Sequence, residues 1–154
     1  MHDPLVAYPG YSLRRAANAT AAELSALLAE IDLRQADASL LLLVEANPRI
    51  TGSALGRQLD IQRANMVPLL KRLEDNGLIE RQPIDGKSQG LTLTGEGRKR
   101  AGQARAIIDR FEDSLLERVP PHTARTFFPR SKRSGADRPA ALEQAKQVTA
   151  GRRH

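Results

Sequence analysis

The hydrophobic positions in the middle of the chain form two patterns in succession. The first recurs every three or four residues, the spacing of one face of an α-helix, and consists of Met66, Leu69, Leu70 and Leu73. Asn76-Gly77 follows, and glycine takes the left-handed conformation that ends helices at little steric cost. Residues 78–82 and 91–93 then read as two strands around a turn-rich loop at 83–90. The pattern predicts a helix with one buried face, followed directly by a β-hairpin.

Two longer helices are expected before this unit. An apolar period of three to four residues runs over 12–31, and residues 36–46 contain a run of leucines that predicts a buried helix. Asn47-Pro48 stops the second helix. The first eleven residues, 1–11, are expected to be flexible, because Pro4, Pro9 and Gly10 oppose regular structure.

A short helix is expected between these long helices and the hairpin. Ile50 can form a one-residue bridge to the hairpin, and Thr51 can cap a helix over residues 52–59. Asp60 ends that helix only a few residues before the next one begins. Two short helices joined so tightly predict a helix-turn-helix, with the hairpin as its wing.

After the hairpin, Thr94 is placed to cap a helix over residues 95–119, which ends before Pro120-Pro121. A helix of this length overhangs a domain of this size, so part of its apolar stripe would be exposed in a monomer. Pairing with a second copy is the simplest remedy. The residues expected in that contact are Leu13, Leu24, Ile108, Phe111, Leu115 and Val119.

Charge is unevenly distributed along the 154 residues, which we expect to form one domain. The net charge is +6, and residues 120–154 account for it with eight Lys/Arg against two acids. The span 49–105 carries eleven bases and six acids. Both regions would attract a polyanion. The basic tail, 121–154, lacks a clear period, and we expect it to be partly disordered.

Several functional classes are disfavoured by what the sequence lacks. There is no cysteine, and the three histidines lie at positions 2, 122 and 154 without partners at useful spacing. No nucleophile motif or phosphate-binding glycine loop is present. We therefore expect no enzymatic activity, no metal and no cofactor. No run of about eighteen apolar residues occurs, so a cytoplasmic protein without membrane contact is expected.

The order of elements resembles that of the MarR family of transcription regulators over about residues 12–120. The matching fragments are Asn47-Pro48, Thr51-Gly52-Ser53-Ala54-Leu55, Leu73-Glu74, Gly77-Leu78-Ile79-Glu80-Arg81, Asp85-Gly86-Lys87 and Leu91-Thr92-Leu93-Thr94 with Gly97. The resemblance implies a mainly α fold with a small β-hairpin wing, a winged helix-turn-helix over 36–94 between two long dimerisation helices, 12–31 and 95–119. It further implies a homodimer on a palindromic site and a small, often aromatic, effector.

Sequence readout is expected at the front of the recognition helix, where Arg pairs with guanine and Asn or Gln with adenine. The residues assigned to base readout are Gln62, Arg63, Ala64 and Asn65. Those assigned to phosphates or to the wing are Arg49, Ser53, Arg57, Pro68, Lys71, Arg72, Lys87 and Ser88. In the resembled family, residues comparable to Arg81 and Asp85 form an ion pair that shapes the wing, which implies a structural role for both.

Three local questions stay open at this point. The recognition helix begins either near Met66, with Asn65 as its cap, or two or three residues earlier, as the family register implies. Arg63 and Arg72 either face DNA or form surface ion pairs with acids such as Asp60 and Asp75. Residues 98–100 are a solvated cationic face that could also lie near phosphates.

The sequence thus predicts a dimeric, ligand-responsive, DNA-binding transcription regulator, most simply a repressor. Two alternatives from other classes remain. The winged helix could be a protein-interaction module, or the basic tail could make the chain a non-specific architectural nucleic-acid-binding protein.

Overall fold

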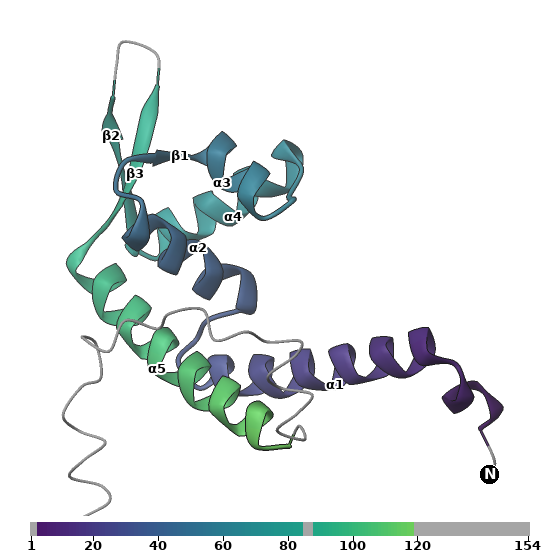
Figure 1. Ribbon diagram of the computed structural model, residues 1–154. Helices are drawn as coiled ribbons and strands as arrows, with labels where there is room; N and C mark the ends of the chain where they lie inside the picture. Colours follow the sequence, from purple (N-terminus) through teal and green to yellow (C-terminus); the bar gives the residue numbers. More distant parts are fainter. Residues whose placement is uncertain (1–2, 85–87, 119–154) are drawn as a thin grey trace, which may run out of the picture. The chain divides into compact units, whose positions relative to one another are not determined.

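The computed structural model describes residues 3–84 and 88–118, and it is mainly helical with one small sheet (Figure 1). The elements in chain order are η1 (Pro4–Ala7), α1 (Pro9–Ala29), α2 (Gln35–Ala46), β1 (Ile50–Thr51), α3 (Gly52–Gln58), α4 (Arg63–Asp75), β2 (Ile79–Pro83), β3 (Gln89–Leu93) and α5 (Gly95–Arg118). This order confirms the predicted winged helix-turn-helix. Over the described ranges, no helix combines the length and the apolar character that crossing a membrane requires.

The N-terminal segment is helical from Pro4 on, whereas the sequence predicted a flexible segment. Its prolines do not prevent regular structure, because each stands where a helix begins: Pro4 opens the 3-10 helix η1 and Pro9 opens α1. A proline there loses no helical hydrogen bond, and its fixed φ already suits the helix. Asp3 caps η1 by accepting a hydrogen bond from the Leu5 amide (3.0 Å), and its other oxygen accepts one from the Tyr11 hydroxyl (3.1 Å).

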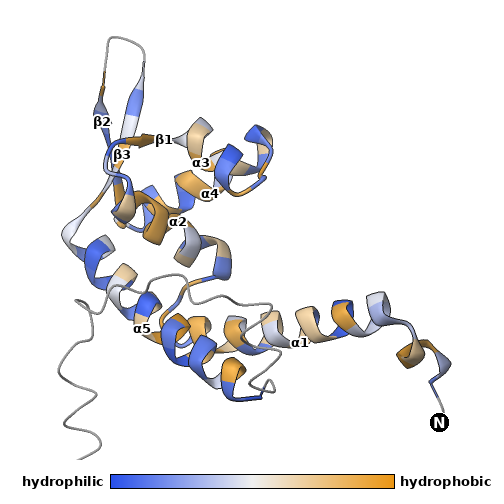
Figure 2. Ribbon diagram, viewed as in Figure 1, coloured by the Kyte–Doolittle hydropathy of each residue, from blue (hydrophilic) through white to orange (hydrophobic). Residues whose placement is uncertain are grey.

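The hydrophobic core is centred on α2, whose apolar character is visible along much of its length in Figure 2. The largest fully buried side chains come from five different elements and are Leu28, Leu40, Leu41, Val44, Leu55, Leu73 and Leu91. Leu42 and Leu43 are only half-buried, so α2 is less completely enclosed than its leucine run predicts. The core therefore joins α1, the helix-turn-helix and the wing in one cluster.

The sheet has the strand order β1-β3-β2, with both pairs antiparallel. The predicted bridge from Ile50 is confirmed, because Ile50 lies opposite Leu91. Gly90 is required beside it: a Cβ on this residue would lie 2.7 Å from the Arg49 carbonyl oxygen. β2 has the predicted length but is shifted by one residue, whereas β3 begins two residues earlier than predicted, and the pairing extends to Pro83 opposite Gln89.

The C-terminal end of α4 is formed by local hydrogen bonds at the predicted position. Gly77 has a φ of +66°, as expected for the residue after a helix C-cap. The amide of Leu78 donates to the Leu73 carbonyl (2.9 Å), and the amide of Gly77 donates to that of Glu74 (2.8 Å). These two bonds turn the chain from α4 into β2 within a few residues.

Candidate nucleic-acid interface

The recognition helix α4 begins at Arg63, with Gln62 as its N-cap, which answers the question of its start. The amides of Asn65 and Met66 both donate to the Gln62 carbonyl, at 2.9 and 3.0 Å. Pro68 is therefore the sixth residue of the helix and not part of its first turn. Because proline has no N–H, the Ala64 carbonyl receives no intrahelical hydrogen bond from position 68.

The two faces of α4 differ as the sequence predicts. Met66, Leu70 and Leu73 are buried against the core. The opposite side is exposed, and we call it the outer face of α4; its residues are Arg63, Ala64, Val67, Pro68 and Lys71. Gln62 and Asn65 are also exposed. All four residues assigned to base readout thus lie at the exposed N-terminal end of the helix, and their contact with bases stays a prediction.

Arg63 and Arg57 have no acidic partner among the described residues. Within residues 3–84 and 88–118, neither guanidinium lies within ion-pair distance of a carboxylate, so the suggested pair between Arg63 and Asp60 does not form. Both side chains are exposed, Arg57 near the end of α3 and Arg63 at the start of α4. A positive charge without an acidic partner at a helix N-terminus, as at Arg63, favours the binding of an anion.

The contacts of Arg72 differ from the phosphate contact that was predicted for it. Its Nη2 donates to Oδ1 of Asp37, a side chain that is only 5% exposed. The second oxygen of Asp37 accepts a hydrogen bond from the Arg34 amide (3.1 Å) and so caps α2. Arg72 therefore ties the end of α4 to the start of α2. The signal available in the sequence was an aspartate in the first turn of a strongly apolar helix, which needs a partner once buried.

Lys71 pairs with Asp75 one turn further along α4, with 2.9 Å between Nζ and Oδ2. Both side chains are largely exposed, so the pair is weak and leaves Lys71 accessible to a phosphate. Asp75 thus pairs with Lys71 and not with Arg72, the partner considered from the sequence.

Two arginines attach β2 of the wing to the rest of the domain, one from β2 itself and one from the segment before β1. Arg81 of β2 donates twice to Glu74 of α4, from Nε to Oε1 (2.5 Å) and from Nη2 to Oε2 (3.1 Å). The hydrogen bond to Glu74 raises the pKa of Arg81 above its ordinary value. Arg49 donates from Nη2 to the Pro83 carbonyl (2.9 Å). Asp85 and Lys87 lie outside the described residues, so the implied pair between Arg81 and Asp85 stays a prediction.

The start of α3 is capped as predicted. Thr51 Oγ1 accepts a hydrogen bond from the Ala54 amide (3.2 Å) and lies 3.1 Å from Ser53 Oγ. Ser53 is exposed at this end of α3, which suits the phosphate contact expected of it. Ser88, the other serine assigned to that group, is half-buried beside the wing tip.

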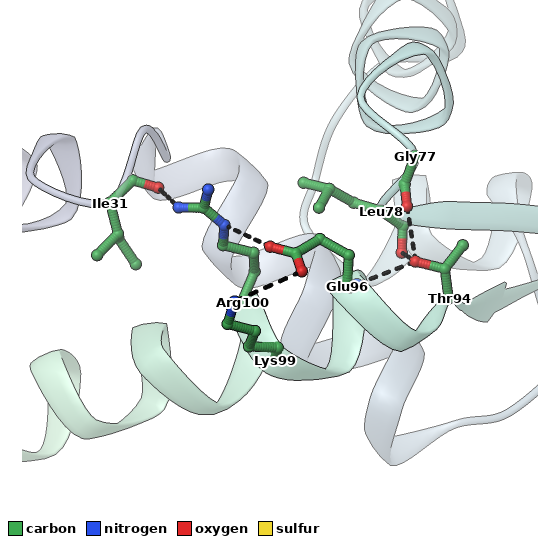
Figure 3. A network of polar contacts seen from close by, with 8 residues as sticks. Ile31, Gly77, Leu78, Thr94, Glu96, Lys99 and Arg100 are labelled. Atoms are coloured by element: carbon green, nitrogen blue, oxygen red, sulfur yellow. Dashed lines mark hydrogen bonds and ion pairs between the residues drawn. The ribbon is translucent and has the colours of Figure 1, made fainter.

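A network of polar contacts fixes the start of α5 to the turn between α4 and β2 (Figure 3). Thr94 is the predicted N-cap, and its hydroxyl accepts from the Gly97 amide (3.0 Å) while donating to the Gly77 carbonyl (2.6 Å). Gly97 lies so close to Leu78 that a Cβ would be 1.9 Å from the Leu78 carbonyl oxygen. The first turn of α5 and the end of α4 must therefore move together.

Arg100 extends this network to the end of α1. Its Nη1 donates to the Ile31 carbonyl (2.6 Å), and its Nε donates to Glu96 (3.2 Å), as Figure 3 shows. Arg98 donates from Nη1 to the Leu93 carbonyl (2.9 Å). Residues 98–100 are consequently not a uniform solvated cationic face. The sequence offered no signal for these contacts, because a backbone carbonyl acceptor can belong to any residue type.

A groove of about 500 Å³ lies between α1 and α5. Its apolar lining includes Leu27, Ile107 and Phe111, and its charged lining includes Glu30 and Arg110. Phe111 is 5% exposed, so this chain buries a side chain that was expected in the contact with a second copy. The physical reason is its position on the side of α5 that faces α1.

The other residues expected in the contact between copies differ in exposure. Leu13 is 71% exposed. Leu24 and Ile108 are half-buried against the core, and Leu115 is half-buried. Val119 lies outside the described residues. Within residues 3–84 and 88–118 no group of three His, Cys, Asp or Glu side chains is arranged to bind a metal ion.

Comparison with known proteins finds relatives that share this geometry. Residues 33–87 match the model of the MarR family. The HTH-type transcriptional repressor Rv2887 of Mycobacterium tuberculosis (strain ATCC 25618 / H37Rv) is 28% identical over 130 residues, which cover 83% of this chain and 94% of that protein.

Solved structures agree with the sequence match. The transcriptional repressor CouR bound to a 23-mer DNA duplex is similar with a TM-score of 0.73 and 27% identity, over 97% of this chain and 98% of CouR. CouR bound to p-coumaroyl-CoA has a TM-score of 0.71 and 26% identity, over 100% of this chain and 99% of CouR. Rv2887 in complex with salicylic acid has a TM-score of 0.62 and 28% identity, over 77% of this chain and 90% of Rv2887. The winged helix-turn-helix and these similarities support the identification of the chain as a MarR-family winged-helix regulator.

Proposed function

We propose that this protein is a homodimeric, DNA-binding transcription repressor that a small ligand releases from a palindromic operator. The observation that carries the proposal is the exposed N-terminal end of α4, where Arg63 has no acidic partner among the described residues and lies with Gln62 and Asn65. The MarR family consists of transcription regulators, which are not enzymes. A role on the chromosome also makes the cytoplasm the proposed location.

The proposed DNA contacts divide into two groups. Gln62, Arg63 and Asn65 read base edges in the major groove, with Ala64 packed beside them. Arg57, Ser53 and Lys71 are placed around them for phosphates, which position the helix without specifying sequence. A solved structure of the similar repressor CouR is bound to a 23-mer DNA duplex, which supports the same ligand class for this chain.

Exposed apolar surface supports the homodimer. Four large side chains in η1 and the first turns of α1 are at least 47% exposed, namely Leu5, Val6, Tyr8 and Leu13. Such a cluster is costly to leave in water, and a second copy of the same helix would cover it. In a dimer the two α4 helices would enter successive major grooves, one helical turn of DNA apart.

The groove between α1 and α5 is the proposed effector site. The ligands in the structures of similar proteins are salicylic acid and p-coumaroyl-CoA, which both contain a phenol ring. Leu27, Ile107 and Phe111 offer an apolar surface for such a ring, and Arg110 offers a cation for an acidic group.

A mechanism of release follows from how α5 is attached. A ligand that changed the separation of α1 and α5 would act on Arg100, which binds the end of α1, and on Thr94, which binds the end of α4. The ligand would favour dimers whose recognition helices no longer match the spacing of the operator half-sites.

The test is a selection of bound sequences from random duplexes at modest salt, followed by titration with aromatic acids such as salicylate. We expect an inverted repeat, a dimer by analytical ultracentrifugation, and loss of DNA binding on adding an effective acid. Removing residues 121–154 should leave the specific footprint in place. A monomer that ignores every inverted repeat would refute the proposal, and loss of all binding with the tail would favour an architectural protein.

A further inference from the structure

We propose that Val67 reads the C5-methyl group of a thymine in the major groove, and that part of the protein's sequence preference therefore comes from apolar contact. This inference rests on the proposed DNA-binding function and adds a specificity-determining residue that the sequence analysis did not assign.

The position of Val67 is the first observation. Its side chain is 56% exposed, and among the described residues it is the large exposed hydrophobic side chain that α3 and α4 contribute. It lies one turn after Arg63 and one turn before Lys71, on the outer face of α4 between two cationic side chains. If α4 lies in the major groove with Arg63 at a base edge, Val67 faces the bases as well.

The neighbours of Val67 make the centre of this face apolar. Ala64 and Pro68 are exposed on either side of it, and neither side chain donates or accepts a hydrogen bond. An exposed helix surface is usually filled with residues such as Glu, Lys, Arg or Ala, which favour the helix and tolerate water. A β-branched residue beside a proline gives no such advantage in the isolated protein, and its apolar surface is better used in a complex.

The major groove offers one apolar group on the four standard bases, the C5-methyl of thymine. Valine suits it because its χ1 is restricted to one strongly preferred rotamer in a helix, so little side-chain freedom is lost on contact. Val67 is about 6 Å further along the helix axis than Arg63, which is close to two base-pair steps. We therefore expect the thymine within about two or three base pairs of the position that Arg63 reads.

The test uses the full-length chain and the duplex found by selection. Each thymine is replaced in turn by deoxyuridine, which keeps every hydrogen-bonding group of the base and lacks only the methyl. Burying one such group contributes about 0.8 kcal/mol, or about a fourfold change in affinity. We expect about a fourfold rise in Kd at one position in each half-site, and about fifteenfold when both symmetrical positions are replaced, measured by fluorescence anisotropy.

Protein variants then identify the side chain responsible. Val67→Ala should bind the thymine and uracil duplexes equally, because the two methyl groups that make the contact are gone. Val67→Thr keeps the shape and one methyl and should retain part of the difference. Arg57→Ala is the matched control: it should weaken binding to both duplexes and leave their ratio unchanged. None of these exposed positions is needed for folding, which a circular dichroism melt would verify.

The outcomes separate the inference from the function it rests on. If selection returns no preferred duplex, the proposed function itself fails. If a specific site is found and uracil is neutral at every position, DNA binding stands and the role of Val67 is overturned. If Val67→Ala still distinguishes thymine from uracil, another side chain reads the methyl group and the inference is equally overturned.

Discussion

The two halves of the recognition helix α4 use charged residues in opposite ways. In the C-terminal half, three neighbouring charged side chains have partners: Lys71 with Asp75, Arg72 with Asp37, and Glu74 with Arg81. In the N-terminal half, Arg63 has no carboxylate within ion-pair distance among residues 3–84 and 88–118. The same helix is thus attached to the protein at one end and presented to solvent at the other.

The difference shows that position on a helix does not by itself reveal what an arginine does. Arg63 and Arg72 are both part of α4, and the sequence assigns both to DNA. The structure separates them through burial: Arg72 lies against a carboxylate that is only 5% exposed, whereas Arg63 faces water. Four substitutions, taken from the largest expected effect to the smallest, test whether this division is real.

Arg63→Ala should have the largest effect, and it should act on DNA binding alone. A bidentate contact with guanine discriminates by about 1–3 kcal/mol, so a dimer should lose about 2–6 kcal/mol of preference for its cognate site. Kd values for the selected and a scrambled duplex would measure this loss. The melting temperature should not change, because the side chain makes no ion pair with the described residues.

The matched control for that prediction is Arg57→Ala. Loss of a phosphate contact should weaken binding to both duplexes alike and reduce the dependence of affinity on salt. If Arg63→Ala behaves in the same way as this control, Arg63 does not read bases.

Arg72→Ala should lower the free energy of unfolding, and the loss should be seen in the absence of DNA. It would leave the buried Asp37 carboxylate without its cation, and breaking a buried pair in this way costs about 3–5 kcal/mol. We expect about 2–3 kcal/mol, because Asp37 keeps the hydrogen bond from the Arg34 amide. Urea unfolding followed by circular dichroism measures this loss of stability. Lys71→Ala, which removes an exposed pair, should cost no more than about 0.5 kcal/mol, and equal effects would contradict the division.

Pro68→Ala should raise stability, because Pro68 lies where the two halves of α4 meet. Alanine restores an N–H for the Ala64 carbonyl, and proline in a helix interior is about 3 kcal/mol less favourable than alanine. A gain of about 1–3 kcal/mol in the urea experiment is expected. A neutral result would indicate a helix that begins near Met66, where Pro68 would fall in the first turn.

Arg81→Ala should have the smallest effect, about 1 kcal/mol or less, because the pair with Glu74 is partly exposed. The raised pKa of Arg81 determines its pH dependence. Stabilisation from a raised pKa is fully present below the ordinary arginine value and is lost only above it, so this contribution should be constant from about pH 6 to about pH 9. Unfolding at several pH values, with Arg81→Lys as the charge-preserving control, tests this. An arginine effect that varied over that range would contradict it.

Much of the fold could be predicted because it depends on neighbours in sequence. The buried stripe of α4 follows from helical spacing, and Thr51 and Thr94 cap helices whose amides lie three residues away. Gly77 adopts the positive φ that its place after a helix predicts. The start of α4 could not be predicted in the same way, because a helix that begins near Met66 and one that begins two or three residues earlier both fit the local sequence. Only the observed backbone, with Gln62 as the N-cap, distinguishes them.

What only the tertiary structure decided is the choice of partners. Arg72 and Asp37 are 35 residues apart, and Arg100 and the Ile31 carbonyl are 69 residues apart. Local spacing carries no information on such pairs, since an arginine accepts any carboxylate or carbonyl that packing brings within reach. The sequence by itself therefore determined which segments form helices and strands and which sides are apolar. Packing determined which cations the protein uses internally and which it leaves for a ligand, because burial sets the cost of an unpaired charge.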